Sequence, residues 1–271
     1  MTGVRIRAVL AVLGLILTTG CGSTAPESIV DKPTLVVGVR SDLPLVGWQR
    51  DDGSLEGLDV DVARDLAGRL GADLELVPVR AADRESALLT GKVDLVLAVF
   101  SITQDRKTRV GFAGPYFLSY QDLLVRRDET AIRTVRDLAG RRLCAVAGSN
   151  VPDRIVKEKG VPAVLVPAAD YGACVSMLRD RRIDAIATND VILAGLAHQA
   201  GGAVRLLNAR YSQERTGVGM RPGDVAGCEA VNRAITEMYQ DGTAQRLAHT
   251  WFGASGIDLS TIAVPQFEGC S

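Results

Sequence analysis

The sequence of 271 residues is poor in histidine and aromatic residues and carries almost no excess charge. Its two histidines, His198 and His249, have no partners at the spacing of zinc ligands, so we expect no metal site. A net charge of −1 provides no positive surface for nucleic acid or an anionic membrane. Outside the N-terminus, no apolar run is long enough to span a bilayer. The composition is otherwise that of a globular protein with one large or two modest domains.

The N-terminus has the pattern of an export signal. Arg5 and Arg7 precede an apolar stretch over residues 8–17, and Gly20-Cys21 follows. A basic start, a short apolar core and small residues at the end are typical of a secretory signal peptide. The ending resembles the lipobox of bacterial lipoproteins, although Thr18 stands where that motif usually has an aliphatic residue. We therefore expect a signal peptide over residues 1–20, a diacylated Cys21 and a flexible tether over residues 21–33.

Four cysteines remain once Cys21 is set aside as a lipid site. An even number in an exported protein suggests two disulfides, for which three pairings are possible. The nearest-neighbour choice, which we predict, is Cys144–Cys174 and Cys228–Cys270. Buried free thiols are the alternative.

Hydrophobic periodicity predicts two sets of alternating strands and helices. The first set has strands at 35–39, 74–79 and 93–100, with helices within 57–70 and 84–90. The second has strands at 120–125, 143–146, 163–166, 185–187, 204–207 and 218–220. Its helices are predicted at 135–138, 152–158, 172–181, 228–241 and 243–252, and a further helix begins at the turn of residues 188–190. The second set is inserted before the first is completed, which implies two lobes joined by crossing strands near 117–123 and 216–220. We predict that residues 34–117 and 217–271 form one lobe, the latter with a C-terminal tail, and that residues 118–216 form the other.

One strand end carries the residues of an anion site. Residues 93–100 form an apolar run that reads as a buried strand, and Ser101, Thr103 and Arg106 follow it. Two hydroxyls, a helix start and a guanidinium at the carboxyl end of a strand suit a carboxylate ligand. A solvated surface arginine is the alternative.

A series of short motifs, in order along the chain, resembles the bacterial extracellular solute-binding proteins of family 3, the amino-acid receptors of ABC importers. These motifs are Gly57-Leu58-Asp59-Val60-Asp61-Val62, Gly91-Lys92-Val93-Asp94-Leu95, Ser101-Ile102-Thr103 with Arg106, Phe112 with Gly114-Pro115-Tyr116, Asp137-Leu138-Ala139-Gly140, Asp184-Ala185 and Asp241-Gly242-Thr243. Cys144 and Cys174 together with residues 190–195 further resemble actinobacterial receptors of the glutamate/glutamine type. The resemblance implies an α/β fold of the two-lobe periplasmic-binding-protein type (type II). Each lobe is then a β-sheet flanked by helices, two crossover strands form the hinge, and the lobes close over one amino acid.

The resemblance also implies roles for residues around the cleft. Arg106 would bind the ligand α-carboxylate in bidentate geometry, with Ser101 and Thr103 beside it. Ser149 and Asn150 match a loop that contacts the ligand from the second lobe. The family usually presents an aspartate to the ligand ammonium, but this chain has Asn189 at that position, so Asp190 is expected to supply the charge.

The side-chain pocket is expected to be cationic. Basic residues at the positions of Arg40 and Arg84 hold the side-chain carboxylate in glutamate/aspartate receptors of the family, and two buried guanidiniums would need an anion. Trp48 is a candidate to cap the cleft. Solvated arginines and a packing tryptophan are the alternatives. Asp59 and Asp61 are expected only to cap a helix and face solvent.

The resulting hypothesis is a substrate-binding receptor, not an enzyme, for glutamate or aspartate and conceivably glutamine or asparagine. We expect no cofactor, a monomer, ABC permease subunits as partners, and attachment to the outer face of the cell membrane through lipidated Cys21. The alternatives are an amino-acid sensor that signals to a membrane partner, and a cyclohexadienyl-dehydratase-like enzyme, which would need a general acid in the cleft.

Overall fold

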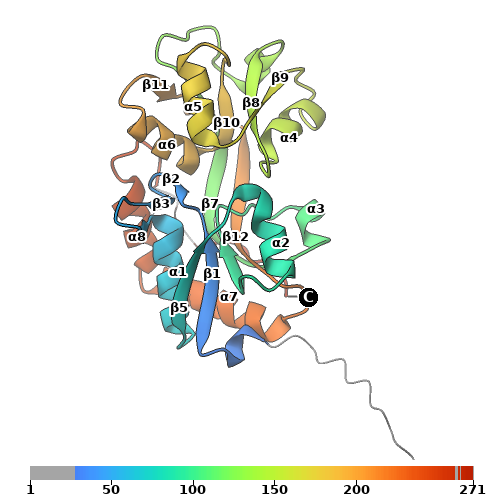
Figure 1. The fold of residues 1–271 in the computed structure, drawn as a ribbon, viewed down its shortest axis with the longest axis vertical. Coiled ribbons are helices and arrows are strands. Elements are labelled where there is room, and N and C mark those ends of the chain that lie inside the picture. Colours follow the sequence, from blue (N-terminus) through green and yellow to red (C-terminus); the bar gives the residue numbers. More distant parts are fainter. Residues whose placement is uncertain (1–27, 260–261, 263, 271) are drawn as a thin grey trace, which may run out of the picture.

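The computed structural model describes residues 28–259, 262 and 264–270, which form two α/β lobes joined by two long strands (Figure 1). The predicted signal peptide, Cys21 and most of the tether lie outside the described residues. Within the described part of the chain, no helix is long and apolar enough to cross a membrane. The two α/β lobes joined by two long strands confirm the predicted two-lobe fold (Figure 1).

The first lobe is built on parallel strands in the order β5 (Asp73–Pro78), β1 (Thr34–Val39) and β6 (Leu95–Leu97). Its helices are α1 (Leu58–Arg69), α2 (Arg84–Leu89), α3 (Gln104–Lys107), α7 (Val225–Gln240) and α8 (Thr243–Phe252), with short helices η1 (Ile29–Asp31) and η2 (Ala81–Asp83). The apolar residues of α1 lie on one side and are buried, as its periodicity predicts. A small antiparallel sheet, which the sequence did not predict, consists of β2 (Asp42–Leu43), β3 (Gly47–Gln49) and β4 (Leu55–Glu56).

The second lobe contains β8 (Arg142–Val146) paired in parallel with β9 (Val164–Ala168). A backbone bridge between Leu143 and Ala185 places β8 beside β10 (Ile186–Asn189). The helices are α4 (Val151–Lys157), α5 (Tyr171–Arg179) and α6 (Asp190–Gln199), with the short helix η3 (Val135–Leu138). Strand β11 (Val204–Leu206) completes the lobe. These elements agree with the predicted strands and helices to within a few residues.

The two connecting strands are longer than the sequence suggested. β7 (Gly111–Arg126) runs without a break through Gly114 and Pro115, and it pairs with β12 (Ser212–Met220) in antiparallel fashion. The far end of β7 pairs with β10 and β11, and β12 pairs with β6. One continuous seven-stranded sheet therefore passes through both lobes. The predicted strand over residues 120–125 was only the second half of β7, because Gly114-Pro115 reads as a turn in isolation.

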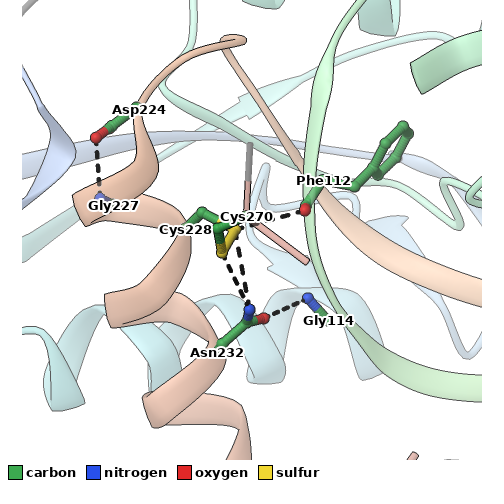
Figure 2. Close-up of a disulfide and its surroundings, with 7 residues drawn as sticks. All are labelled: Phe112, Gly114, Asp224, Gly227, Cys228, Asn232 and Cys270. Atoms are coloured by element: carbon green, nitrogen blue, oxygen red, sulfur yellow. Dashed lines mark hydrogen bonds between the residues drawn. A yellow bond between two sulfur atoms is a disulfide. The ribbon is translucent and has the colours of Figure 1, made fainter. Parts of the chain in front are cut away.

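Both predicted disulfides are present in the structure. Cys144 on β8 is bonded to Cys174 on α5 within the second lobe, and Cys228 on α7 is bonded to Cys270 near the C-terminus. Figure 2 shows the second bridge beside Asn232, whose amide lies against both sulfurs. The Asn232 oxygen accepts a hydrogen bond of 2.7 Å from the Gly114 N–H, so this side chain ties α7 to β7. Each disulfide fastens elements of a single lobe.

We predict that reduction of the two disulfides destabilises the lobes without changing the fold. Each bridge closes a loop of 30 or 42 residues, and such loops are typically worth about 2–4 kcal/mol. Chemical denaturation with and without reductant should measure this loss. Mass spectrometry of the oxidised protein after alkylation should find none of these four cysteines modified; modification of any of them would contradict the pairing.

Candidate functional site

Two cavities lie between the lobes, and residues of both lobes line each of them. The small cavity, of about 20 Å³, is lined by Arg40, Ala81, Arg84, Ala98, Val99, Ser101, Arg106, Gly148, Ser149, Asn150, Tyr171, Thr188, Asn189 and Ile192. The large cavity, of about 620 Å³, is lined by Glu85, Ile102, Thr103, Gln104, Asp105, Arg106, Arg109, Gly148, Ser149, Asn150, Asp153, Arg154, Glu158, Gln213, Glu214 and Arg215. Arg106 and residues 148–150 belong to both, so the cavities adjoin.

The strand ends explain why distant residues meet here. Arg40 directly follows β1, and the loop of Gly148, Ser149 and Asn150 follows β8. Asn189 ends β10. In open α/β sheets the carboxyl ends of strands form the ligand-binding edge. The position of the site therefore follows from the strand pattern.

Arg84 and Arg106 converge on one backbone oxygen of the opposite lobe. The Arg84 guanidinium donates to the Gly148 carbonyl at 2.9 Å, and the Arg106 guanidinium donates to the same oxygen at 3.0 Å. Arg84 also donates to the carbonyls of Ala98 and Val99, and Arg106 to that of Ser101. Both guanidiniums contact the ring of Phe100, at 4.6 and 4.8 Å from its centroid. These acceptors are neutral. Arg106 also forms an ion pair of 4.0 Å with Glu85, whereas Arg84 forms no ion pair among the described residues.

The electrostatics of these arginines reflect that burial. Both side chains are almost fully buried. Burial lowers the pKa of Arg84, and the positive charges of Arg106 and Arg40 lower it further. Burial also lowers the pKa of Arg106, although Glu85 partly opposes the shift. A bound anion would remove this penalty.

Arg40 differs from the other two arginines because it has a carboxylate at hydrogen-bond distance. Its guanidinium makes a bidentate contact with the Asp42 carboxylate, at 2.8 and 2.6 Å. Asp42, only two residues further along the chain, was not among the predicted site residues. The positive charge of Arg40 is thus already compensated, although its side chain still lines the small cavity.

The second lobe contributes a polar wall. The Tyr171 hydroxyl lies 3.2 Å from the Ser149 hydroxyl and 2.8 Å from that of Thr188. The Asn189 amide donates to the Ser119 hydroxyl at 2.9 Å. The Asn150 amide nitrogen has no hydrogen-bond partner among the described residues. Tyr171 and Thr188 were missed from the sequence, since a tyrosine at a helix start gives no distinctive signal.

The structure brings together eight of the ten predicted ligand-binding residues at the two cavities, namely Arg40, Arg84, Ser101, Thr103, Arg106, Ser149, Asn150 and Asn189. Thr103 lines only the large cavity, and its hydroxyl caps α3 by accepting from the Arg106 N–H. Trp48, on β3, lines neither cavity.

Asp190 points away from both cavities. Its carboxylate accepts hydrogen bonds from the N–H groups of Tyr120 and Val191, and it forms an ion pair of 3.3 Å with Arg210. It lines a separate cavity of about 160 Å³. The structure therefore does not bring Asp190 to the position where an ammonium beside Arg106 would lie.

The expectation that Asp59 faces solvent was wrong. Asp59 is buried, and its carboxylate accepts from the Tyr116 hydroxyl at 2.6 Å and the Val99 N–H at 2.9 Å. Burial raises its pKa to about 6, and these two hydrogen bonds oppose the shift. The backbone of the strand-end loop at Val99 needs a partner, and Asp59 provides it. The Asp61 carboxylate instead accepts hydrogen bonds from the side chains of Arg64 and Trp251.

Among the described residues, no group of three or more histidine, cysteine or acidic side chains is arranged to hold a metal ion.

Two β/α lobes joined by paired strands, with buried cations facing across the cleft, define a two-lobe solute-binding protein. Residues 35–254 match the model of the family described as bacterial extracellular solute-binding proteins, family 3, and the chain belongs to this family.

Similar proteins cover nearly the whole chain. The glutamate-binding protein GluB of Corynebacterium glutamicum is 35% identical over 276 residues, covering 94% of this chain and 93% of that protein. The L-cystine-binding protein TcyJ of Escherichia coli is 31% identical over 256 residues, covering 92% of this chain and 96% of that protein. Among solved structures, an ancestral arginine-binding protein bound to arginine has a TM-score of 0.76 at 29% identity and covers 82% of this chain and 99% of its own. The ancestral amino-acid-binding protein AncCDT-1, described as a precursor of cyclohexadienyl dehydratase, has a TM-score of 0.74 at 29% identity and covers 83% of this chain and 100% of its own.

We predict a pH-dependent stability term from Asp190. Burial raises its pKa to about 6, above its ordinary value of 3.8. As the pH rises between these values, the unfolded state loses the proton before the folded state does, so the stability contribution of Asp190 decreases. The free energy of unfolding of wild type minus that of Asp190→Asn should fall by about 2 kcal/mol from about pH 4 to about pH 7. Urea denaturation across this range measures the difference; a constant difference would contradict the assignment.

Proposed function

We propose that this protein is the substrate-binding receptor of an ABC importer for a polar, acidic amino acid, and that it binds by closure of the two lobes. The observation that supports this most directly is the convergence of Arg84 and Arg106, both buried, on the carbonyl of Gly148 across the cleft. Two desolvated guanidiniums with a neutral acceptor favour a ligand that carries negative charge.

In this proposal Arg106 binds the α-carboxylate. It lies at the junction of the two cavities and has the planar pair of donors that a carboxylate accepts. A carboxylate oxygen of the ligand would take the place that the Gly148 carbonyl occupies between the guanidiniums. Ser101, Ser149 and Asn150 lie beside it, and the amide nitrogen of Asn150 is a donor without a partner in the described part of the chain.

Arg84 would bind the acidic side chain of the ligand. Arg40 would have a lesser role, because Asp42 already compensates its charge. Glutamate or aspartate fits this arrangement best, and glutamine or asparagine would lose the charge interaction with Arg84. The name of GluB is consistent with this choice, whereas other relatives are named for cystine or glutamine.

A receptor role fits the site better than catalysis does. A dehydratase needs a general acid at the substrate. Asp59 has a raised pKa near the cleft, but it lines neither cavity, and its carboxylate is held by Tyr116 and Val99. Signalling to a membrane partner without transport is the second candidate function, which a binding site of this kind would serve equally well.

We predict that Arg106→Ala abolishes binding of every amino acid, because the α-carboxylate is common to all of them. Arg84→Ala should weaken glutamate and aspartate much more than glutamine or asparagine, and Arg40→Ala should do so to a smaller degree. Loss of one partner of a desolvated charge pair costs roughly 2–5 kcal/mol. Calorimetry with the twenty amino acids should measure these changes, with the exposed Arg64→Ala as control.

The acidic specificity would be contradicted if wild type preferred arginine, lysine or an apolar amino acid over glutamate. In that case the receptor function would survive with another ligand. Absence of binding to any amino acid, together with turnover of prephenate or arogenate, would support the enzyme instead.

We also predict that the protein is attached to the outer face of the cell membrane through a lipid on Cys21. Cys21→Ser should leave the precursor uncleaved or release the protein into the medium, because a single residue carries the anchor. Membrane fractionation and intact mass analysis test this, with Thr18→Leu as a control that keeps the anchor. Normal processing and full membrane retention of Cys21→Ser would contradict the prediction.

A further inference from the structure

A ligand ammonium has no negatively charged partner in the small cavity. Three guanidiniums line it, and no carboxylate does so among the described residues. Asn189 is an amide without charge, and Asp190 is turned to the separate cavity beside Arg210. If the proposed amino-acid function holds, the positive charge of the ammonium must be compensated elsewhere near Arg106.

The large cavity offers five carboxylates, and only one of them is buried. The side chain of Glu214 is 3% exposed, whereas that of Glu85 is 27% exposed. The side chains of Asp105, Asp153 and Glu158 are between 58% and 79% exposed, and each pairs with a cation on its own or a neighbouring turn. An interaction with an exposed charge is weak because water screens it. Glu214 is therefore the most buried carboxylate of the large cavity, and its charge acts on the Arg106 guanidinium. Glu85 acts more strongly on Arg106, from 4.0 Å, but it is more exposed to water.

Glu214 belongs to a polar row on one face of the two hinge strands. It stands opposite Ser119 in the register of β7 and β12. Ser119 and Gln121 are two residues apart and so share a face of β7. The Gln121 amide donates to the Glu214 carboxylate, and the Asn189 amide donates to the Ser119 hydroxyl. Arg154 from α4 forms an ion pair of 2.5 Å with Glu214, on the same oxygen, Oε1, that the Gln121 amide contacts, so a ligand ammonium would share this carboxylate with Arg154. The row thus extends from the hinge to the place where Asn189 ends β10.

The same row contains acceptors that lack a donor. Gln121 is fully buried and Thr216 is nearly so, yet the side-chain oxygen of each has no hydrogen-bond partner within the described residues. Buried acceptors of this kind are rare and usually find a partner when the missing group is present. An ammonium has three donors and no acceptor, which matches the buried carboxylate of Glu214 at the wall of the large cavity.

We propose that Glu214, which the Gln121 amide holds in place, binds the α-ammonium of the ligand. The amino acid then lies across the junction of the two cavities, with its carboxylate on Arg106 and its ammonium against the hinge strands. This assignment rests on the proposed amino-acid function and replaces Asn189 and Asp190 as the source of negative charge.

Calorimetry with L-glutamate and with glutarate, which lacks the amino group, tests the assignment. Wild type should bind glutamate far more tightly than glutarate. Glu214→Gln should weaken glutamate roughly 30-fold or more and leave glutarate within a few-fold, so the preference for the amino compound disappears. Glu85→Gln changes a partly buried carboxylate beside Arg106 and is the matched control; it should keep the preference for glutamate over glutarate. If another amino acid binds best, that amino acid and its analogue without the amino group serve as the pair.

The outcomes separate the two proposals. If wild type binds no amino acid, the proposed function fails. If wild type binds but Glu214→Gln retains the preference, or weakens glutamate and glutarate equally, the ammonium assignment is overturned while the function stands. Thermal melting without ligand identifies a variant that does not fold. In that event Gln121→Met, which keeps the volume and removes the amide that holds Glu214, should weaken glutamate more than glutarate, and an unchanged ratio would also overturn the assignment.

Discussion

The arrangement on which the rest of the structure depends is the approach of two buried guanidiniums to one carbonyl oxygen across the cleft. Arg84 and Arg106 come from the first lobe and Gly148 from the second, so these hydrogen bonds join the lobes. The neutral carbonyl satisfies donors but does not balance charge. The glycine is required, since a Cβ at residue 148 would lie 2.4 Å from the Ala81 carbonyl carbon, and its φ of +82° disfavours other residues. The loop that contacts the arginines is therefore fixed by its backbone, while under the proposed function a ligand anion would replace its interaction with them.

The rest of the fold would allow a ligand to replace the hydrogen bonds between the arginines and Gly148. β7 and β12 run through both lobes as neighbours in one sheet, so a change in the angle between the lobes requires only a change in the twist of paired strands. Neither of the two disulfides crosses the cleft: Cys144–Cys174 lies within the second lobe, and Cys228–Cys270 fastens the C-terminal segment to α7 of the first. Each disulfide braces one lobe, and the hydrogen bonds from Arg84 and Arg106 to Gly148 join the lobes across the cleft.

Much of this arrangement could be predicted from the sequence, for identifiable reasons. Alternating strands and helices, together with the rule that ligands bind at strand ends, brought Arg40, Ser101, Arg106 and Asn189 to one edge. What the sequence could not provide was the direction in which a side chain points. Asp190 follows Asn189 directly, but it begins helix α6 and its carboxylate contacts Arg210 away from both cavities. Asp42 is close to Arg40 in the chain, and their contact depends on the conformation of the segment after β1. Glu214 lies opposite Ser119 through pairing between strands, which has no local signature.

The charges around the cleft come from different parts of the fold, and the names of similar proteins include chemically different ligands, namely glutamate, cystine and arginine. In this chain the three guanidiniums of the small cavity come from the first lobe, whereas the buried carboxylate of Glu214 comes from a hinge strand and pairs with Arg154 of the second lobe. Under the proposed binding mode, this charge lies on a strand that both lobes share, so it would contact the amino-acid group while the arginines and the Gly148 loop enclose the rest of the ligand. Selectivity for the amino-acid group and selectivity for the side chain would then reside in separate parts of the molecule, so that one can change without loss of the other.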